Sequence, residues 1–169
     1  RRGAGVVLDP RNGDVLALAS APGFDPNLMC PAPASEHWRA LNRDPRRPLF
    51  NRAIAGAYPP GSVFKPLVAI AALEHGASPE AVYDCTGVFT LGEMRLRCWS
   101  RQGHGPLKLR RAIEQSCNPF FCHLGVSLGI GSIRETAAGA GFGARSGIEL
   151  PGESPGLLPG DAWKRKTQG

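Results

Sequence analysis

The sequence predicts an α+β fold, because two short strand patterns at its beginning are followed by segments that are mostly helical by pattern. The strands are expected at residues 4–9 and 14–20, on either side of the turn sequence Pro10-Arg11-Asn12-Gly13. Two strands do not make a stable sheet by themselves. Further strands of the same sheet are therefore expected from outside this segment.

Helices are expected where apolar residues recur at helical spacing and where glycine or proline marks an end. These segments are residues 36–42, 62–75, 107–116, 119–128 and 130–140. A small hairpin is expected at 88–97, and irregular chain at 21–35 and from Leu150 onward. The expected order of elements is two strands and then mainly helices.

The composition is that of a globular domain, since 42% of the 169 residues are hydrophobic and 20% are charged. No apolar stretch approaches the ~20 residues of a membrane-spanning helix. The chain begins at Arg1 without a methionine and ends in a polar run. We therefore interpret residues 1–169 as one partial domain of a longer protein.

The net charge of +6 and the pI of about 9.4 fit either an anionic partner, such as nucleic acid, or a solvated basic surface. No aromatic residues are interleaved with the basic ones in the way that single-stranded nucleic-acid binders require. We therefore expect no nucleic-acid partner.

Ser62 and Lys65 form a Ser-x-x-Lys motif at the start of the helix expected over 62–75. Positions i and i+3 lie on the same helix face, so the lysine amine could reach the serine hydroxyl. A desolvated lysine loses its proton more easily and can act as a general base. By itself the motif also fits a serine that caps a helix and a solvated lysine, so it needs support from elsewhere in the chain.

The tripeptide Ser116-Cys117-Asn118 supplies that support, because it places a second serine and an asparagine between two helical patterns. A second hydroxyl can pass protons between a lysine and a leaving amine, and an asparagine amide can both donate to and accept from a substrate amide. A pair of helix-capping residues is the alternative interpretation of this tripeptide taken alone.

Several longer stretches agree with these motifs in order and in flanking sequence. They are GVVLDPRNGDVLALAS (5–20), GFDPN (23–27), RPLFNRAIAGAYPPGSVFKP (47–66), GHGPLKLRRAIEQSCNPFFCHLG (103–125) and residues 139–159. Across essentially the whole chain the sequence resembles the first part of the transpeptidase domain of class B penicillin-binding proteins, and its elongation-specific branch most of all. The resemblance implies the partial α+β fold of penicillin-binding proteins and serine β-lactamases.

The resemblance also implies roles for four residues. Ser62 is the expected nucleophile, Lys65 its base, Ser116 a proton relay and Asn118 a substrate anchor; Ser62, Ser116 and Asn118 are also expected to contact the substrate. Such enzymes cross-link peptidoglycan stem peptides through an acyl-enzyme formed at D-Ala-D-Ala, and β-lactams stall at that stage. A membrane glycosyltransferase partner, the cell inner membrane and a periplasm-facing domain are expected by the same resemblance.

One departure concerns the third family motif, Lys-Ser/Thr-Gly. The terminal residues 166–169 do not supply it, because Gln168 interrupts the Thr-Gly pair. We therefore expect this segment alone to be inactive or nearly so. Three alternatives stay open: a serine β-lactamase, a β-lactam sensor on the same scaffold, and a non-catalytic structural remnant held by zinc.

A second cluster of chemical interest combines three cysteines with a histidine. The residues are Cys85, Cys98, His104 and Cys117, with Asp84 as an alternative to Cys85. Three thiolates and one imidazole form a closed tetrahedral zinc set, and some elongation-type members resemble this chain in having metal-ligand residues here. The expected zinc is structural, and catalysis needs no cofactor. Buried free thiols or one disulfide are the alternatives.

The remaining cysteines and histidines are expected to have no role in that cluster. Cys122 and His123 follow a helical pattern and are expected to be packing residues, whereas Cys30 in its proline-rich loop is expected to stay free. His37 and His75 are expected at the surface.

Overall fold

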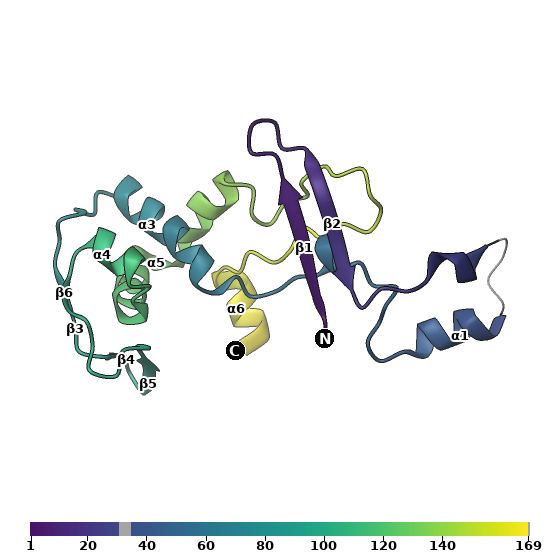
Figure 1. Ribbon diagram of the computed structural model, residues 1–169. Coiled ribbons are helices and arrows are strands. Elements are labelled where there is room, and N and C mark those ends of the chain that lie inside the picture. Colours follow the sequence, from purple (N-terminus) through teal and green to yellow (C-terminus); the bar gives the residue numbers. More distant parts are fainter. Residues whose placement is uncertain (31–34, 169) are drawn as a thin grey trace. The chain divides into compact units, whose positions relative to one another are not determined.

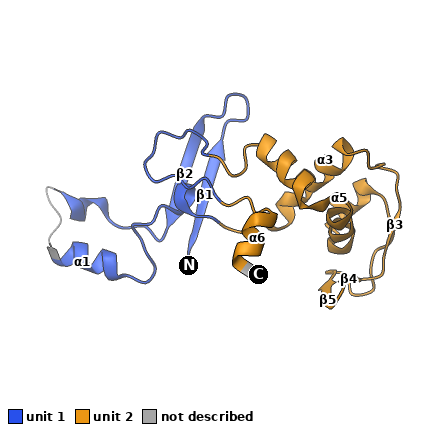
Figure 2. Ribbon diagram, turned by 180° about the vertical axis from the view of Figure 1, so that it is seen from behind, with its two compact units in different colours: residues 1–57, 145–156 blue, residues 58–144, 157–169 orange. Residues whose placement is uncertain are grey.

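The computed structural model describes residues 1–30 and 35–168, and it divides into two compact units (Figures 1 and 2). Unit 1 comprises residues 1–57 and 145–156, and unit 2 comprises residues 58–144 and 157–169. Helices and strands both occur, in agreement with the predicted α+β class. Residues 31–34 of the predicted loop 21–35 lie outside the described residues.

Unit 1 begins with an antiparallel hairpin of β1 (Gly3–Leu8) and β2 (Val15–Ala21), which confirms the two predicted strands to within one residue. The tight turn needs Gly13, whose φ of 84° is a left-handed value that glycine adopts without strain. Both faces of the hairpin are largely exposed, and Leu16 is 65% accessible. The described part of the chain provides no third strand for this sheet.

The rest of unit 1 consists of short helices and turns. These are the 3₁₀ helix η1 (Pro26–Met29), α1 (Ser35–Arg43) and α2 (Arg52–Ala55). Arg52 is a buried cation whose guanidinium donates to the carbonyl oxygens of Arg46, Arg47 and Phe50. These bonds satisfy the buried donors and fix the turn that precedes α2.

Unit 2 opens with the 3₁₀ helix η2 (Gly61–Phe64), which continues directly into α3 (Lys65–Glu74). The predicted helix over 62–75 is therefore confirmed, but its first turn is the tighter 3₁₀ type. Pro66 lies in the first turn of α3, where a missing N–H leaves no helical bond unmade. Four α3 residues are buried on its inner face: Val68, Ala69, Ala71 and Ala72.

Two small antiparallel ladders follow α3. β3 (Tyr83–Cys85) pairs with β6 (Gly105–Leu107), and β4 (Val88–Leu91) pairs with β5 (Met94–Arg97) as the predicted hairpin. Because residues 105–107 are used by β6, the helix predicted from residue 107 begins only at Leu109. Gly103 lies so close to this ladder that a Cβ there would stand 1.9 Å from the Cys85 carbonyl oxygen.

The remaining helices of unit 2 are α4 (Leu109–Glu114), α5 (Asn118–Gly139) and α6 (Asp161–Gln168). The helical geometry of α5 is interrupted at Gly129, with φ 75° and ψ 161°, so the two predicted helices 119–128 and 130–140 form one kinked rod. The expectation of irregular chain from Leu150 onward is wrong for residues 161–168. α6 contains only two apolar residues, Ala162 and Trp163, too few for the repeating apolar pattern on which sequence reasoning depended.

The hydrophobic core of the described residues lies within unit 2, where α3 and α5 pack together. Its members include Leu109 and Ala112 of α4 and the adjacent rings of Phe120 and Phe121 in α5. Cysteines 85, 98 and 117 belong to the same core. The start of α5 is therefore held by apolar packing. None of the described helices is long and apolar enough to span a membrane.

Candidate active site and cysteine–histidine cluster

The candidate active site is organised around the ammonium group of Lys65, the first residue of α3. Lys65 Nζ donates to three oxygens: the Ser116 carbonyl at 2.7 Å, Ser116 Oγ at 3.0 Å and Asn118 Oδ1 at 2.7 Å. Three acceptors match the three protons of an ammonium group. The structure therefore brings together three of the four residues that the sequence singled out.

The backbone of Ser116 explains how one residue supplies two of those oxygens. Ser116 lies between α4 and α5 with φ 47°, an uncommon left-handed value for a residue other than glycine. Its N–H is held by the carbonyl of Ile113 at 2.9 Å, and Cys117 N–H donates to Ala112 at 3.0 Å. These bonds close α4 so that both the carbonyl and the hydroxyl of Ser116 reach Lys65.

Asn118 begins α5, and its amide is oriented by Lys65. An ammonium group can only donate, so the side-chain oxygen of Asn118 must be the atom that faces Lys65. The NH₂ group of Asn118 then keeps its two donors for another partner. That arrangement suits the binding of a carbonyl oxygen.

The environment of Lys65 makes its ammonium group easier to deprotonate. Burial lowers the pKa of Lys65 below its ordinary value of 10.5, and the nearby cysteines, Cys117 first among them, offset part of this effect. The ring of Phe121 lies 5.6 Å from Nζ. Sequence reasoning did not single out Phe121, although an aromatic residue one helical turn from Asn118 faces the same side of α5.

Ser62 occupies the exposed turn η2 directly before Lys65. Within the described residues its hydroxyl makes no hydrogen bond, and the expected Ser62–Lys65 bond is not formed. The reason is that Lys65 directs all three of its donors to Ser116 and Asn118. An exposed hydroxyl three residues before a lysine with a lowered pKa supplies the two groups that nucleophilic catalysis needs.

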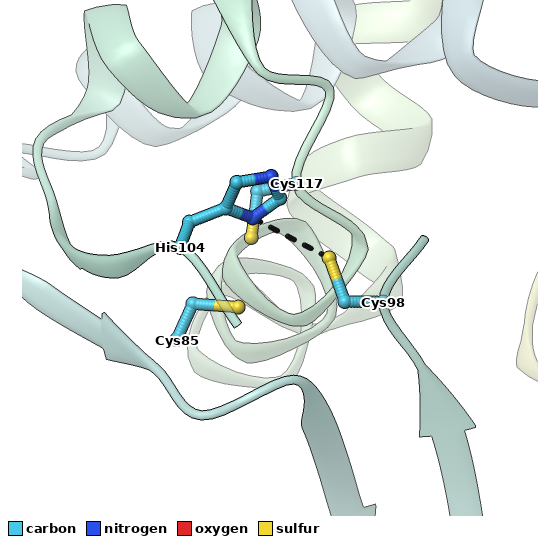
Figure 3. A group of neighbouring side chains, drawn as sticks. All are labelled: Cys85, Cys98, His104 and Cys117. Carbon is cyan, nitrogen blue, oxygen red and sulfur yellow. Dashed lines mark hydrogen bonds between the residues drawn. The ribbon is translucent and has the colours of Figure 1, made fainter. Parts of the chain in front are cut away.

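The second cluster contains the four residues expected to bind zinc. The ligand atoms of Cys85, Cys98, His104 and Cys117 all lie within 4.8 Å of one another. Figure 3 shows the four side chains converging from β3, the end of β5, the loop before β6 and the start of α5. Cys98 Sγ is 3.4 Å from His104 Nδ1.

The donor set fits a zinc ion. The three cysteines are buried, and the nitrogen of His104 that faces them is Nδ1, whereas Nε2, which is buried and has no hydrogen-bond partner among the described residues, points away from the sulfurs in Figure 3. Three thiols and an imidazole form a closed set for zinc, and a bound cation would stabilise the thiolates that burial otherwise disfavours. Asp84, the alternative to Cys85, is exposed and is not one of the four clustered residues, since neighbouring strand residues point to opposite faces.

Two thiols of this cluster, those of Cys85 and Cys117, have pKa values that shift in opposite directions. Burial raises the pKa of Cys117 to about 12. Burial opposes ionisation of Cys85 too, but the N–H groups of Gly87 and His104 and the neighbouring thiols outweigh it, so the pKa of Cys85 falls. All five cysteines are free, which leaves the predicted alternative of one disulfide unformed here.

The residues that were expected to have no role lie outside the cluster. Cys30 is free and exposed, and Cys122 is half-buried in α5. The ring of His123 stacks on Tyr83 at a centroid distance of 4.9 Å. His75 Nδ1 pairs with the carbonyl of Ala71 at 2.8 Å, which closes the end of α3.

Comparison with known proteins agrees with the fold and the site. Residues 3–169 match the family described as the penicillin binding protein transpeptidase domain. The chain therefore belongs to the penicillin-binding protein transpeptidases.

Two relatives show which branch of the family it resembles. The chain is 41% identical over 172 residues to the peptidoglycan D,D-transpeptidase MrdA of Escherichia coli K12, covering 98% of this chain and 26% of that protein. It is 39% identical to the crystal structure of Pseudomonas aeruginosa PBP2, with a TM-score of 0.89 and coverage of 99% of this chain and 39% of that one. The chain thus spans about a quarter of the length of its curated relatives.

Proposed function

We propose that the protein containing this chain is a peptidoglycan D,D-transpeptidase that cross-links stem peptides during cell-wall elongation. The main support for this proposal is the hydrogen-bonded group of Lys65, Ser116 and Asn118. The exposed hydroxyl of Ser62 lies in the turn that directly precedes Lys65. The similarity to MrdA proteins supports the same reaction. The full protein's substrates and partners are part of this proposal.

In the proposed reaction, neutral Lys65 accepts the proton of Ser62, whose Oγ attacks the carbonyl carbon of the D-Ala-D-Ala peptide bond. The amine of the terminal D-Ala takes a proton by way of Ser116 and leaves, so that Ser62 carries the acyl group. An amine of a neighbouring stem peptide then displaces Ser62. The NH₂ group of Asn118 donates to the peptide carbonyl of the donor strand and holds it in place.

The test uses the full-length protein, because this chain spans only about a quarter of the length of its relatives. Intact mass is measured after exposure to penicillin, for the parent and for Ser62→Ala. A persistent penicilloyl adduct on the parent that is absent from Ser62→Ala is the expected result. Rapid loss of the adduct would identify a β-lactamase instead, and a folded parent without any adduct would contradict the proposal.

We further propose that Cys85, Cys98, His104 and Cys117 hold a structural zinc ion. The three buried thiols and His104 Nδ1, which lies 3.4 Å from Cys98 Sγ, support this site. A zinc ion would tie the 85–104 segment to the start of α5. Elemental analysis of the purified protein tests it, with one zinc per chain expected and none in a variant lacking two of the thiols.

The place of the protein in the cell is proposed from its relatives. Helicobacter pylori PBP2 has been solved in complex with MreC, and a relative 40% identical to this chain belongs to a peptidoglycan synthase complex. We expect a periplasm-facing domain at the inner membrane that works beside a glycosyltransferase. Co-purification of the full-length protein with a membrane-embedded glycan polymerase would test this expectation.

A further inference from the structure

Cys117 connects the two sites of unit 2. Its neighbours Ser116 and Asn118 provide all three oxygens that bind Lys65. The thiol of Cys117 points the other way and lies fully buried among the cysteine–histidine cluster, with 0% exposure. A change at this thiol therefore acts on the residues that hold Lys65.

The ligand atoms of the cluster all lie within 4.8 Å of one another, so Cys85 and Cys117 are near enough to react with each other. Cys98 Sγ is already paired with His104 Nδ1 at 3.4 Å. The sulfurs of Cys85 and Cys117 lie within 4.8 Å of each other and turn inward in Figure 3. A disulfide requires about 2.05 Å between the sulfurs, so the pair must move closer to form one.

The two partners differ in how freely they can move. Cys85 is fixed in β3 by its pairing with Gly105 in β6, and its carbonyl accepts from His104 N–H at 3.0 Å. Gly103 packs against that same carbonyl with no space for a side chain. On the other side, Cys117 belongs to no strand ladder. Its N–H donates to the Ala112 carbonyl at 3.0 Å, but it follows Ser116, whose φ of 47° is strained for a serine. Closure of the pair is therefore expected to displace Cys117 together with Ser116 and Asn118.

We propose that Cys117 is a positioning residue for the transpeptidase site, and that oxidation of the metal-free cluster to a Cys85–Cys117 disulfide switches the site off. The inference rests on the proposed function of Ser62 and Lys65. With both thiols reduced or bound to zinc, Ser116 and Asn118 hold Lys65. With the disulfide formed, the three oxygens leave their places and acylation of Ser62 slows.

The oxidant is a small peroxide, which suits thiols that are almost inaccessible. One thiolate attacks hydrogen peroxide and becomes a sulfenic acid, with release of hydroxide. The second thiol displaces the sulfenic oxygen and forms the disulfide. In total two thiols and one peroxide give one disulfide and two waters, so two electrons pass from sulfur to oxygen. A bound zinc ion would occupy both thiolates and prevent this.

The experiment uses the full-length protein in a Cys30→Ser background, which removes an exposed thiol outside both sites. The protein is reduced, stripped of metal with a chelator, treated with hydrogen peroxide and then returned to reductant. Peptide mapping identifies the disulfide, and penicillin kinetics separate the acylation rate constant from the binding constant. The same treatment of zinc-loaded protein and of Cys85→Ser provides the controls.

We expect a Cys85–Cys117 disulfide, a fall in the acylation rate constant on the order of 100-fold, little change in the binding constant, and recovery on reduction. Zinc-loaded protein should keep its acylation rate constant after peroxide treatment. The acylation rate constant of Cys85→Ser should be the same before and after treatment. A mapped disulfide with an unchanged acylation rate constant would overturn the inference, as would the absence of this disulfide. The inference would also fail if peroxide lowered the acylation rate constant of Cys85→Ser as much as that of the parent. A reduced protein that is never acylated would instead refute the proposed function.

Discussion

The Lys65 site and the cysteine–histidine cluster share one tripeptide but differ in almost every physical property. The first is half-buried and polar, and each of the three Nζ donors of Lys65 meets one oxygen. The second is buried and brings together three thiols and His104 Nδ1. The first set of groups suits proton transfer, whereas the second is the donor set of a structural zinc site. We therefore expect substitution of Lys65 to affect the reaction directly, and loss of a ligand in the cluster to affect stability and metal content first.

The largest effect is expected from Lys65→Ala, which removes the proposed base and all three of its hydrogen bonds. The acylation rate should fall by about 10²–10⁴-fold while the protein stays folded, because a partly buried cation is removed together with its desolvation cost. Penicillin acylation kinetics and a thermal melt measure the two effects. The matched control is Lys108→Ala, an exposed lysine paired with Glu80. Equal losses in both variants would contradict a special role for Lys65.

The pH dependence of acylation should sharpen the same contrast. Burial lowers the pKa of Lys65, so the neutral base is more abundant at a given pH than for an ordinary lysine. Below that pKa the acylation rate should rise about tenfold per pH unit, with a midpoint below 10.5. By the same shift, the folded state binds fewer protons than the unfolded state between the two pKa values, so stability rises with pH there. A midpoint at or above 10.5 would contradict the effect of burial.

Loss of one ligand in the cluster should act on metal content before it acts on the reaction. His104→Ala is expected to remove bound zinc and to lower the melting temperature, because structural zinc binding contributes directly to folding free energy. His123→Ala, a histidine that only stacks on Tyr83, should retain the metal. Elemental analysis and calorimetry measure both variants. Full zinc content in His104→Ala would exclude this residue as a ligand.

The smallest expected change tests the close packing beside the cluster. Gly103→Ala places a Cβ 1.9 Å from the Cys85 carbonyl oxygen, whereas Gly92→Ala enters open space, and both glycines have positive φ. Gly92→Ala should cost only the backbone strain, about 1 kcal/mol. Gly103→Ala should cost about 1–3 kcal/mol more, because backbone must shift. Denaturant unfolding measures the difference, and equal stabilities would show that the 103 loop moves freely.

How much of this structure the sequence predicts depends on whether the signal is local. The hairpin, the α3 helix and the 88–97 hairpin follow from turn residues and apolar spacing, and all were confirmed. The shortened α4 and the helix α6 were missed. The first depends on pairing between β3 and the distant β6, and the second has too few apolar residues to give a periodic signal.

The sequence by itself predicted the candidate residues, since motif order and flanking residues indicated Ser62, Lys65, Ser116 and Asn118, and cysteine and histidine types indicated the zinc set. Only the tertiary structure decided the partners. Lys65 binds Ser116 and Asn118 in place of Ser62, because α3 and α5 pack side by side and Ser116 adopts a left-handed backbone. Asp84 is excluded from the cluster because its strand neighbour Cys85 faces inward. Residue type carries the chemistry, whereas packing over long sequence distances sets which atoms meet.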